Sequence, residues 1–189
     1  MPNTETALMD EEFMAAALEQ ARIAAAIDEV PIGAVVVQDG AIVSAGYNRR
    51  EADADPSAHA EFSALTEAAR RLGRWRLTGC TVYVTLEPCL MCAGLMQQAR
   101  IDRCVYGADD PKGGALGTLY RVHEDKRLNH SFAVTAGVRA EECSALLSDF
   151  FADLRVQKKL YDKEAQAEEQ AQVEARAHTE EQAQAGGSS

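Results

Sequence analysis

Four residues in two short segments have the types and spacing of a metal-dependent hydrolytic site. The segment HAEFSA begins at His59 and has Glu61 two positions later, whereas LEPCLMCAGL contains Cys89 and Cys92 directly after a proline and three positions apart. One imidazole and two thiolates suit Zn²⁺, and three protein ligands leave one tetrahedral position open for water, as catalytic zinc sites do. The sequence therefore predicts one zinc ion per chain, bound by His59, Cys89 and Cys92.

The expected position of these residues at helix starts favours this chemistry. Residues three apart share a helix face, so both sulfur atoms can reach one ion. A helix N-terminus carries partial positive charge, which lowers the pKa of a thiol and favours the thiolate. Zinc lowers the pKa of its bound water to about 7, but a hydrolytic step also needs a group that moves protons. Glu61 is the candidate, provided that the metal lies near the helix end, because on an ideal helix Glu61 points away from His59.

The elements that must position these residues are predicted from hydrophobic periodicity and turn residues. A first helix starts at Asp10, which can cap it, and Pro31 prevents its continuation. Two β-rich runs then flank Asp39-Gly40, whose residue types tolerate the positive φ angles of a hairpin turn. The helix that carries the histidine is expected to be capped by Ser57 and to stop at Gly73.

The second half of the chain continues this alternation of helices and strands. Pro88 suits the first turn of the short helix that carries the cysteines, because the N–H group that proline lacks is not needed there. A glycine-rich loop, ADDPKGGALGTL, follows a later strand, and a terminal helix runs past Leu160. This order predicts an α/β fold, a three-layer α/β/α sandwich with a mixed five-stranded sheet and an antiparallel opening hairpin. The three strands after the hairpin are CTVYVTL, DRCVYG and SFAVTAGV.

Length and charge indicate one domain with two acidic appendages. The 189 residues are 47% hydrophobic, which suits a single globular core. We predict an acidic extension over 1–12, a catalytic domain over 13–161, and a low-complexity acidic tail over 162–189 that is frayed helix or disordered. Residues 1–12 hold four acids and no base, and residues 162–189 hold seven acids and two bases, so the domain between them carries −2 of the net −11. The net charge therefore does not exclude a nucleic-acid partner.

Sequence features also predict where the protein resides. No apolar run is long enough to cross a membrane, and the acidic first residues lack the pattern of a secretory signal. Two of the five cysteines lie three apart after a proline, which in a reducing compartment favours metal binding over disulfides. Cys80, Cys104 and Cys143 lie in apolar runs and are predicted to be small buried hydrophobic residues. We therefore expect a cytoplasmic protein without a membrane partner.

The sequence resembles the zinc-dependent nucleoside and base deaminases and, among them, the bacterial tRNA-specific adenosine deaminases. The pattern H-x-E followed by P-C-x-x-C is the known signature of zinc deaminases. The likeness extends from Phe13 to Lys159, and it includes the segments VPIGAVVV, GYNRR, DPSAHAE, YVTLEPC, GADDPKGGALG, LNH and ECSALLSDFF. It implies a cytidine deaminase-like fold, with His59, Cys89 and Cys92 as the zinc ligands and Glu61 as the proton shuttle.

The resemblance also implies a substrate and a partner. Members of this family convert adenosine to inosine at the wobble position of tRNA anticodons, and they act as homodimers. Water activated by zinc attacks C6 of adenine, while Glu61 moves protons to the ring nitrogen and the departing ammonia. Asn48 is then expected to hydrogen-bond the base edge, and Asp110 and Lys112 to lie near the sugar and phosphate. Asp109 departs from the family pattern, which has a basic residue there.

Two alternatives remain open from the sequence alone. Deaminases of a free base or nucleotide, such as guanine or cytosine deaminase, share the zinc motif. A non-catalytic zinc module that binds RNA would instead need a fourth protein ligand and would not need Glu61. The residues that could supply this fourth ligand, none of them at ligand-like spacing, are Cys80, Cys104, His123 and His130.

Overall fold

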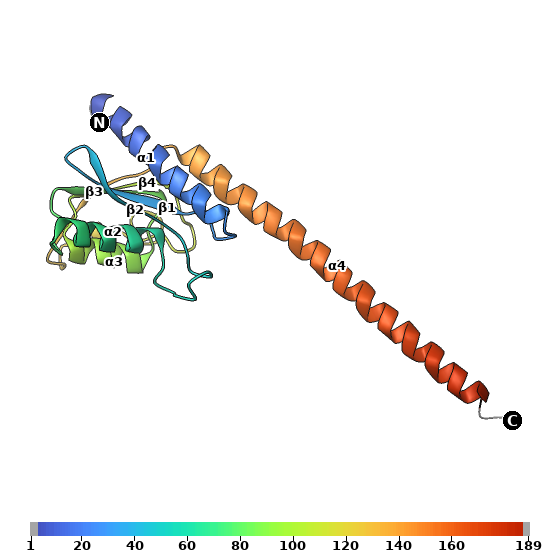
Figure 1. Ribbon diagram of the computed structural model, residues 1–189. Coiled ribbons are helices and arrows are strands. Elements are labelled where there is room, and N and C mark those ends of the chain that lie inside the picture. The colour runs from blue at the N-terminus through green and yellow to red at the C-terminus, as the bar shows by residue number, and fades with distance from the viewer. Residues whose placement is uncertain (1–3, 187–189) are drawn as a thin grey trace. The chain divides into compact units, whose positions relative to one another are not determined.

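The computed structural model of the chain describes the backbone of residues 4–186 and the side chains of residues 4–163, 165–166 and 169–170. The chain forms two compact units, Met1–Ser148 and Asp149–Ser189. The first unit contains all the strands (Figure 1). In chain order the elements are α1 (Thr4–Ala25), β1 (Gly33–Gln38), β2 (Ala41–Tyr47), α2 (Ala60–Leu72), β3 (Cys80–Leu86), α3 (Leu90–Ala99), β4 (Arg103–Ala108), a 3₁₀ turn η1 (Val122–Glu124), β5 (Ala133–Thr135) and α4 (Ala140–Gly186).

The strands form one mixed sheet in the order β2-β1-β3-β4-β5. β1 pairs antiparallel with both β2 and β3, whereas β3, β4 and β5 run parallel. The hairpin turn is at the predicted position, because Asp39 and Gly40 have φ angles of 51° and 74°. This arrangement confirms the predicted mixed five-stranded sheet.

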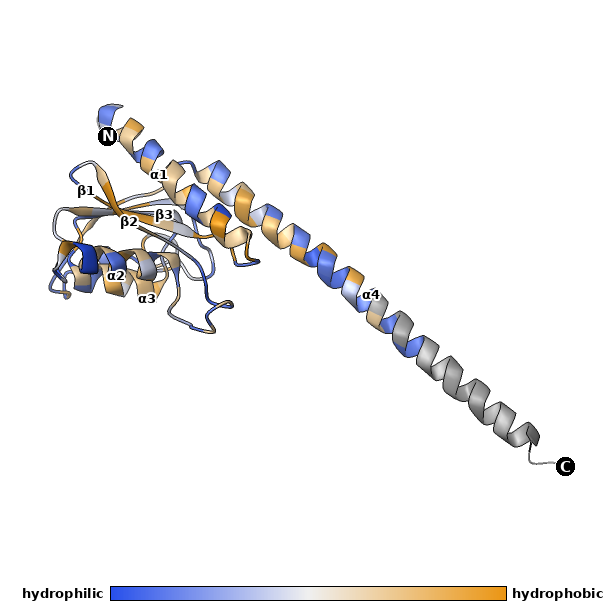
Figure 2. Cartoon of the chain, in the orientation of Figure 1, coloured by the Kyte–Doolittle hydropathy of each residue, from blue (hydrophilic) through white to orange (hydrophobic). Residues whose placement is uncertain are grey.

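Helices cover both faces of the sheet, and the strands supply a hydrophobic face to each layer. Val36 and Val82 belong to the core under α2 and α3, whereas Val35 and Tyr83 belong to the core under α1 and the first turns of α4. Adjacent strand residues point to opposite faces, so the run of hydrophobic residues in each strand serves both cores. Figures 1 and 2 show the central strands between the helical layers, which confirms the predicted three-layer sandwich.

The helix that carries His59 packs unusually close to β2. A Cβ atom at Gly46 would lie 2.5 Å from the carbonyl oxygen of Ala60, at the start of α2, so the approach requires glycine at this position. The hydroxyl of Ser44 donates a 2.7 Å hydrogen bond to the carbonyl oxygen of Ala64. These two contacts fix the start of α2, and therefore His59, against the sheet.

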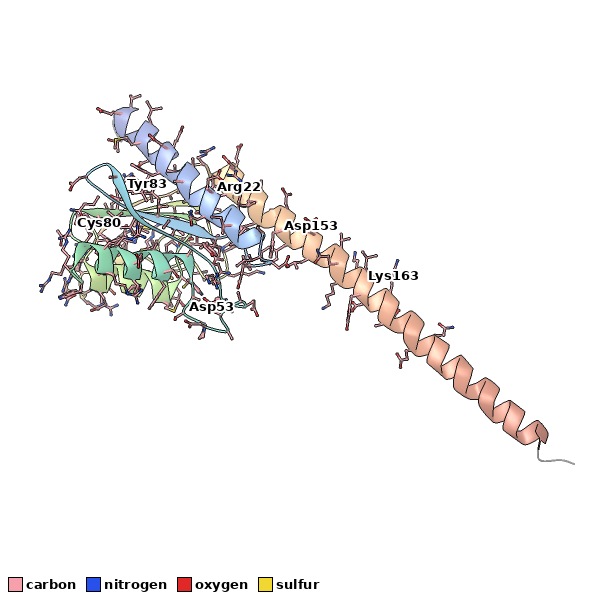
Figure 3. All side chains as sticks on the ribbon, viewed as in Figure 1. Arg22, Asp53, Cys80, Tyr83, Asp153 and Lys163 are labelled. Carbon is pink, nitrogen blue, oxygen red and sulfur yellow. The ribbon has the colours of Figure 1, made fainter. Side chains whose placement is uncertain are left out.

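The first helix begins before its predicted start. The structure has α1 from Thr4, so Asp10 is not an N-cap but lies within the helix and is 2% exposed. Its carboxylate accepts hydrogen bonds of 2.8 and 2.6 Å from the Arg103 guanidinium and one of 2.9 Å from the Tyr83 hydroxyl. Figure 3 labels Tyr83 in this region. The residue type of Asp10 predicts a cap, but its ion pair with Arg103 explains why it is buried within the helix.

Two further element boundaries differ from the prediction. β5 is restricted to Ala133–Thr135, shorter than the predicted strand SFAVTAGV. Pro88 lies before the helix rather than in its first turn, because Cys89 is the N-cap of α3. In the second unit the backbone of α4 stays helical to Gly186, and the predicted limits of the acidic tail stay a prediction. Within residues 4–186, none of the helices is long and apolar enough to cross a membrane.

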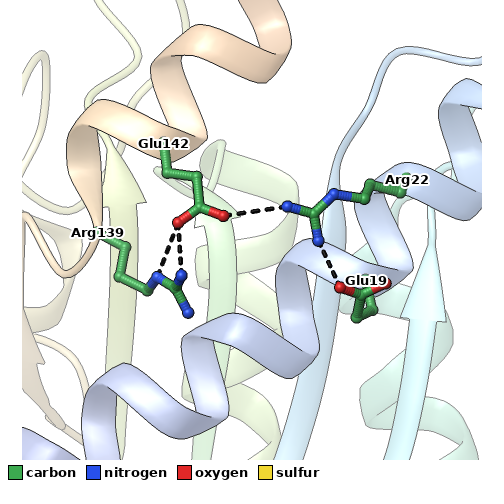
Figure 4. A network of polar contacts seen from close by, with 4 residues as sticks. All are labelled: Glu19, Arg22, Arg139 and Glu142. Carbon is green, nitrogen blue, oxygen red and sulfur yellow. Dashed lines mark hydrogen bonds and ion pairs between the residues drawn. The ribbon is translucent and has the colours of Figure 1, made fainter.

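We expect the buried ion pair between Asp10 and Arg103 to contribute far more stability than an exposed pair. Arg103→Met leaves the Asp10 carboxylate buried without its counterion, and it should lower the free energy of unfolding by about 3–5 kcal/mol. The matched control is Arg22→Met, because Arg22 contacts Glu19 and Glu142 in a half-exposed network (Figure 4). The control should cost about 1 kcal/mol or less in urea unfolding. Equal losses in the two variants would contradict the assignment.

Candidate metal centre and active site

The three predicted metal ligands converge in the first unit. The Nδ1 atom of His59 lies 3.5 Å from the sulfur of Cys92 and 3.8 Å from the sulfur of Cys89. All three ligand atoms lie within 4.8 Å of one another. Atoms bound tetrahedrally to one Zn²⁺ at about 2.0 Å for nitrogen and 2.3 Å for sulfur are separated by roughly 3.5–3.8 Å. The geometry and the donor types of these residues therefore fit zinc.

Two helix N-termini direct these ligands toward one another. His59 is the N-cap of α2 and Cys89 is the N-cap of α3, and both have extended backbone angles. Neither side chain makes a capping hydrogen bond, so both are available to a metal. The prediction that Ser57 caps α2 is wrong, because the Ser57 amide and hydroxyl both bond to the Asp55 carboxylate, at 2.8 and 2.7 Å. Ser57 therefore takes part in an Asx turn with Asp55, and its side chain does not cap α2.

The two cysteines of the cluster differ in the direction in which their pKa is shifted. Hydrogen bonds from Cys92 and then from His59 lower the pKa of Cys89 to about 3, although burial opposes this shift. The hydrogen bond to Cys89 and burial both raise the pKa of Cys92. Of the two cysteines, Cys89 is therefore the one that favours the thiolate form. The thiolate is the form of cysteine that binds a metal, so this shift suits Cys89 to be a ligand.

Glu61 lies in the first turn of α2, directly beyond the N-cap histidine. Its side chain is 4% exposed, and it is within hydrogen-bonding reach of Cys92. Burial raises the pKa of Glu61. The condition set by the sequence is met, because the ligand cluster lies at the end of α2. His59 has extended rather than helical backbone angles, so Glu61 and His59 are not constrained to opposite helix faces.

Asn48 follows β2 and neighbours the turn that carries His59. The N–H of the next residue, Arg49, donates a 3.0 Å hydrogen bond to the carbonyl oxygen of Ala58, which directly precedes His59. Asn48 is 4% exposed, and its amide nitrogen donates to Glu29 at 2.9 Å. In the connection that follows, Arg49 pairs with Asp53 at 2.7 Å, and Figure 3 labels Asp53 there. The side chain of Asn48, the predicted base-binding residue, is therefore fixed by a hydrogen bond and lies beside the turn that carries His59.

Asp110 and Lys112 lie in the glycine-rich loop that follows β4. The Lys112 amide donates to the Asp110 carboxylate at 2.9 Å, which forms a local turn, and the Lys112 side chain is exposed. The loop is tied to the cysteine ligand, because Ala115 N–H donates to the Pro88 carbonyl at 2.9 Å and Gly114 bridges to Cys89. Both predicted residues thus lie on a loop attached to the metal centre.

Glu87 organises this loop, and the sequence analysis did not identify it. Its carboxylate, 2% exposed, accepts hydrogen bonds from the amides of Asp110 (3.1 Å), Leu116 (3.0 Å) and Thr118 (3.0 Å), and from the Thr118 hydroxyl. Burial alone would raise the pKa of Glu87, but these hydrogen bonds outweigh it and lower the pKa. A Cβ atom at Gly114 would lie 2.1 Å from this carboxylate. The sequence feature that could have identified Glu87 is an acidic residue placed between a buried strand and the pair Pro88-Cys89.

The residues considered as a fourth protein ligand do not join the cluster. Cys80 and Cys104 are buried in strands, and His130 contacts the carbonyl oxygen of Ile101 at 2.8 Å. His123 is buried in η1 beside Glu124. Among the side chains that the structure describes, the metal cluster consists of His59, Cys89 and Cys92. The site is therefore an open three-ligand centre, as expected for catalysis rather than for a structural zinc module.

The fold and this open centre define the zinc deaminases. The family model of the cytidine and deoxycytidylate deaminase zinc-binding region matches residues 8–108. The chain is 48% identical over 150 residues to the tRNA-specific adenosine deaminase of Bacillus subtilis, covering 79% of this chain and 93% of that protein. It is 47% identical over 152 residues to its counterpart in Haemophilus influenzae, covering 80% and 88%. The chain belongs to the tRNA-specific adenosine deaminases of this zinc-dependent family.

Solved structures extend the comparison. A tRNA:A34 deaminase studied for A-to-I editing at the wobble position is 44% identical, with a TM-score of 0.70 over 72% of this chain and 99% of that one. A guanine deaminase from Nitrosomonas europaea is 25% identical, with a TM-score of 0.66 over 75% and 84%. The shared architecture thus spans two substrate classes, and sequence identity is higher with the tRNA deaminase.

We expect Cys89→Ser to lose most of its zinc, because only two ligands of the cluster then remain. Cys80→Ser is the matched control, since Cys80 is also a free cysteine but lies outside the cluster. Elemental analysis of the folded proteins should give about one zinc per chain in the control. Full zinc occupancy in Cys89→Ser would remove Cys89 from the ligand set.

Glu87→Gln should loosen the glycine-rich loop. A glutamine offers one oxygen and turns an N–H donor toward other donors, so it should lower the free energy of unfolding by about 1–3 kcal/mol. Trypsin should also cut faster after Lys112. Glu67→Gln is the control, because Glu67 pairs with Arg71 on the exposed side of α2. Unchanged stability and unchanged cleavage in Glu87→Gln would show that the loop is held by other contacts.

Proposed function

We propose that this chain hydrolyses adenosine to inosine at the wobble position of tRNA anticodons. The observation that carries the proposal is the open His59, Cys89 and Cys92 centre with Glu61 buried in the adjoining helix turn. A centre with three ligands leaves room for water, and a buried carboxyl beside it can move protons. The choice of tRNA rather than a free base rests on relatives that are 47–48% identical and are tRNA-specific adenosine deaminases.

The proposed reaction assigns proton movement to Glu61. Zinc, when bound by the three ligands, lowers the pKa of water to about 7 and so makes a nucleophile available at neutral pH. Glu61 would accept one proton from the attacking water as the water oxygen bonds to C6 of adenine, and it would pass that proton to the ring nitrogen N1. Glu61 would then take the second proton from the new C6 hydroxyl and pass it to the exocyclic amine, which departs as ammonia when the C6–N bond breaks. Adenosine and water thus yield inosine and ammonia, and the glutamate is regenerated.

Asn48, Asp110 and Lys112 are the proposed substrate contacts. Asn48 would hydrogen-bond the base, while the exposed Lys112 is suited to a phosphate and Asp110 to the sugar. The target base must swing out into the site, which costs less in an anticodon loop than in a duplex because the loop bases are already unpaired. Contacts to neighbouring nucleotides would supply binding energy that a free nucleoside lacks.

We also propose a homodimer in the cytoplasm. Four apolar side chains beside the metal centre are at least 37% exposed. Two begin α3, one ends the glycine-rich loop and one directly follows it. The Tyr120 N–H donates to the carbonyl oxygen of Gly114, which bridges to Cys89. A second copy would cover such a patch. The exposed apolar residues are Leu90, Met91, Leu119 and Tyr120.

The reducing cytoplasm suits five cysteines that are all free.

The domain limits are part of the same proposal. The deaminase domain comprises residues 13–161, which includes every residue assigned to metal or substrate. Residues 1–12 are an acidic extension, although from Thr4 onward their backbone belongs to α1. Residues 162–189 form an acidic tail whose composition offers little apolar surface for a core of its own.

The substrate is tested with the purified zinc protein and an anticodon stem-loop that has adenosine at the wobble position. Free adenosine, cytidine, cytosine and guanine are incubated separately, and inosine and ammonia are measured. We expect conversion of the stem-loop and far slower reaction of the free compounds. Rapid conversion of guanine or cytosine with an untouched stem-loop would instead support a free-base deaminase.

Glu61→Gln should keep zinc and fold but lose activity. The amide cannot shuttle a proton, and a well-placed acid–base group typically contributes about 10²–10⁴-fold to the rate. Glu67→Gln, on the same helix, should retain the parent rate because Glu67 contacts arginines on the outer face. Zinc content and single-turnover rates on the stem-loop separate the outcomes. Zinc loss in Glu61→Gln would make Glu61 a ligand, and near-normal turnover would refute the shuttle role.

A further inference from the structure

Glu29 is a buried carboxylate that the proposed mechanism does not use. It lies in the turn between α1 and β1 and is 1% exposed. One carboxylate oxygen accepts a 2.9 Å hydrogen bond from the side-chain amide of Asn48. The other accepts a 2.7 Å hydrogen bond from the backbone N–H of Ala52. A carboxylate buried this completely needs partners, and here the partners belong to the segment beside the metal centre.

We infer that Glu29 is a positioning residue that holds the Asn48 amide in one orientation toward the target base. This inference rests on the proposed function, because it assumes that Asn48 contacts the substrate. Its physical content is separate from that assumption, since it concerns the direction in which a buried amide is held. Glu29 does not touch the reacting atoms and acts through Asn48.

Hydrogen-bond chemistry fixes the orientation. Both carboxyl oxygens of Glu29 accept hydrogen bonds, one from Asn48 and one from Ala52, so the nitrogen of the Asn48 amide faces Glu29. The amide oxygen and the second N–H of the same nitrogen are then left for other partners. Among the described residues, the hydrogen bond to Glu29 is the one that holds this side chain, while the Asn48 backbone N–H is fixed by a 3.0 Å bond to Ile32.

The remaining groups of Asn48 match adenine. An asparagine amide can pair with the N6 amino group and the N7 atom of adenine, accepting from the first and donating to the second. Guanine presents two acceptors, O6 and N7, at the same edge. An amide whose nitrogen is already directed by Glu29 cannot rotate freely to suit either base. Glu29 would therefore contribute to selection of adenine by fixing the order of acceptor and donor.

The same hydrogen-bond chemistry predicts that glutamine cannot replace Glu29. A glutamine oxygen that accepts from Ala52 N–H leaves its amide nitrogen facing Asn48. Asn48 would then turn its oxygen toward residue 29 and present only nitrogen to the base. A reversed pair should restore the acceptor, because in Glu29→Gln/Asn48→Asp the glutamine nitrogen donates to one aspartate oxygen and the other oxygen faces the base.

The test measures kcat/KM on the anticodon stem-loop with each variant of the zinc protein. Glu29→Gln should fall at least about 10-fold, and Asn48→Asp should fall further because two carboxylates then face each other. The double variant should recover at least about 10-fold over Asn48→Asp. The control is Glu51→Gln, because Glu51 is an exposed acid in the connection between β2 and α2, and its kcat/KM should match that of the parent. Parent-level activity in Glu29→Gln, or a double variant no better than Asn48→Asp, overturns the inference.

A readout without activity separates this inference from the proposed function. In ¹⁵N spectra the Asn48 side-chain amide is identified by its loss in Asn48→Asp, and its hydrogen exchange is then measured. Slow exchange in the parent and faster exchange in Glu29→Gln support the inference, whereas fast exchange in the parent overturns it. A stem-loop left unconverted by the parent would refute the proposed function and leave this result intact.

Discussion

The buried carboxylate of Glu87 is the contact on which the geometry of the site depends. It follows β3 directly and lies two residues before the ligand Cys89, and it accepts four hydrogen bonds from the loop after β4. Burying a charge is costly unless hydrogen bonds replace its hydration, and here the loop supplies them. The strand, the ligand turn and the loop with Asp110 and Lys112 are therefore held as one assembly. Gly114 is required because any side chain there would occupy the position of the carboxylate.

The helices α2 and α3 lack side-chain caps at their N-termini, and their N-cap residues are candidate metal ligands instead. An N-cap side chain usually accepts a hydrogen bond from the first turn, which contributes about 0.5–2 kcal/mol. His59 and Cys89 occupy N-cap positions without such bonds. Their side chains converge on the candidate metal centre instead, and a metal bound there would offset the missing caps. Both helix N-termini also direct partial positive charge toward the thiolate.

The sequence predicted what is encoded locally. Cys89 and Cys92 are three residues apart, and the hairpin turn is formed by the adjacent residues Asp39 and Gly40, so both features depend on residues that are close in sequence. The two cysteines lie together in the ligand cluster, and the turn lies at its predicted position. The cap assigned to Asp10 failed because Arg103, which lies 93 residues later, binds that carboxylate. The roles of Glu29 and Glu87 also depend on residues that are distant in sequence, because their hydrogen-bond partners lie 19–31 residues away. No periodic pattern in the sequence indicates such partners, so neither residue was predicted.

Four buried acids show how saturation by hydrogen bonds separates supporting roles from chemical ones. Asp10 is paired with a guanidinium and a hydroxyl, Glu87 with four donors and Glu29 with two. Each of these carboxylates is held by donors from other parts of the chain. Glu61 is equally buried, but its contacts are its own backbone and the Cys92 thiol. Among these four acids, Glu61 is therefore the one that is not held by donors from distant parts of the chain, and this difference supports its proposed role in proton transfer.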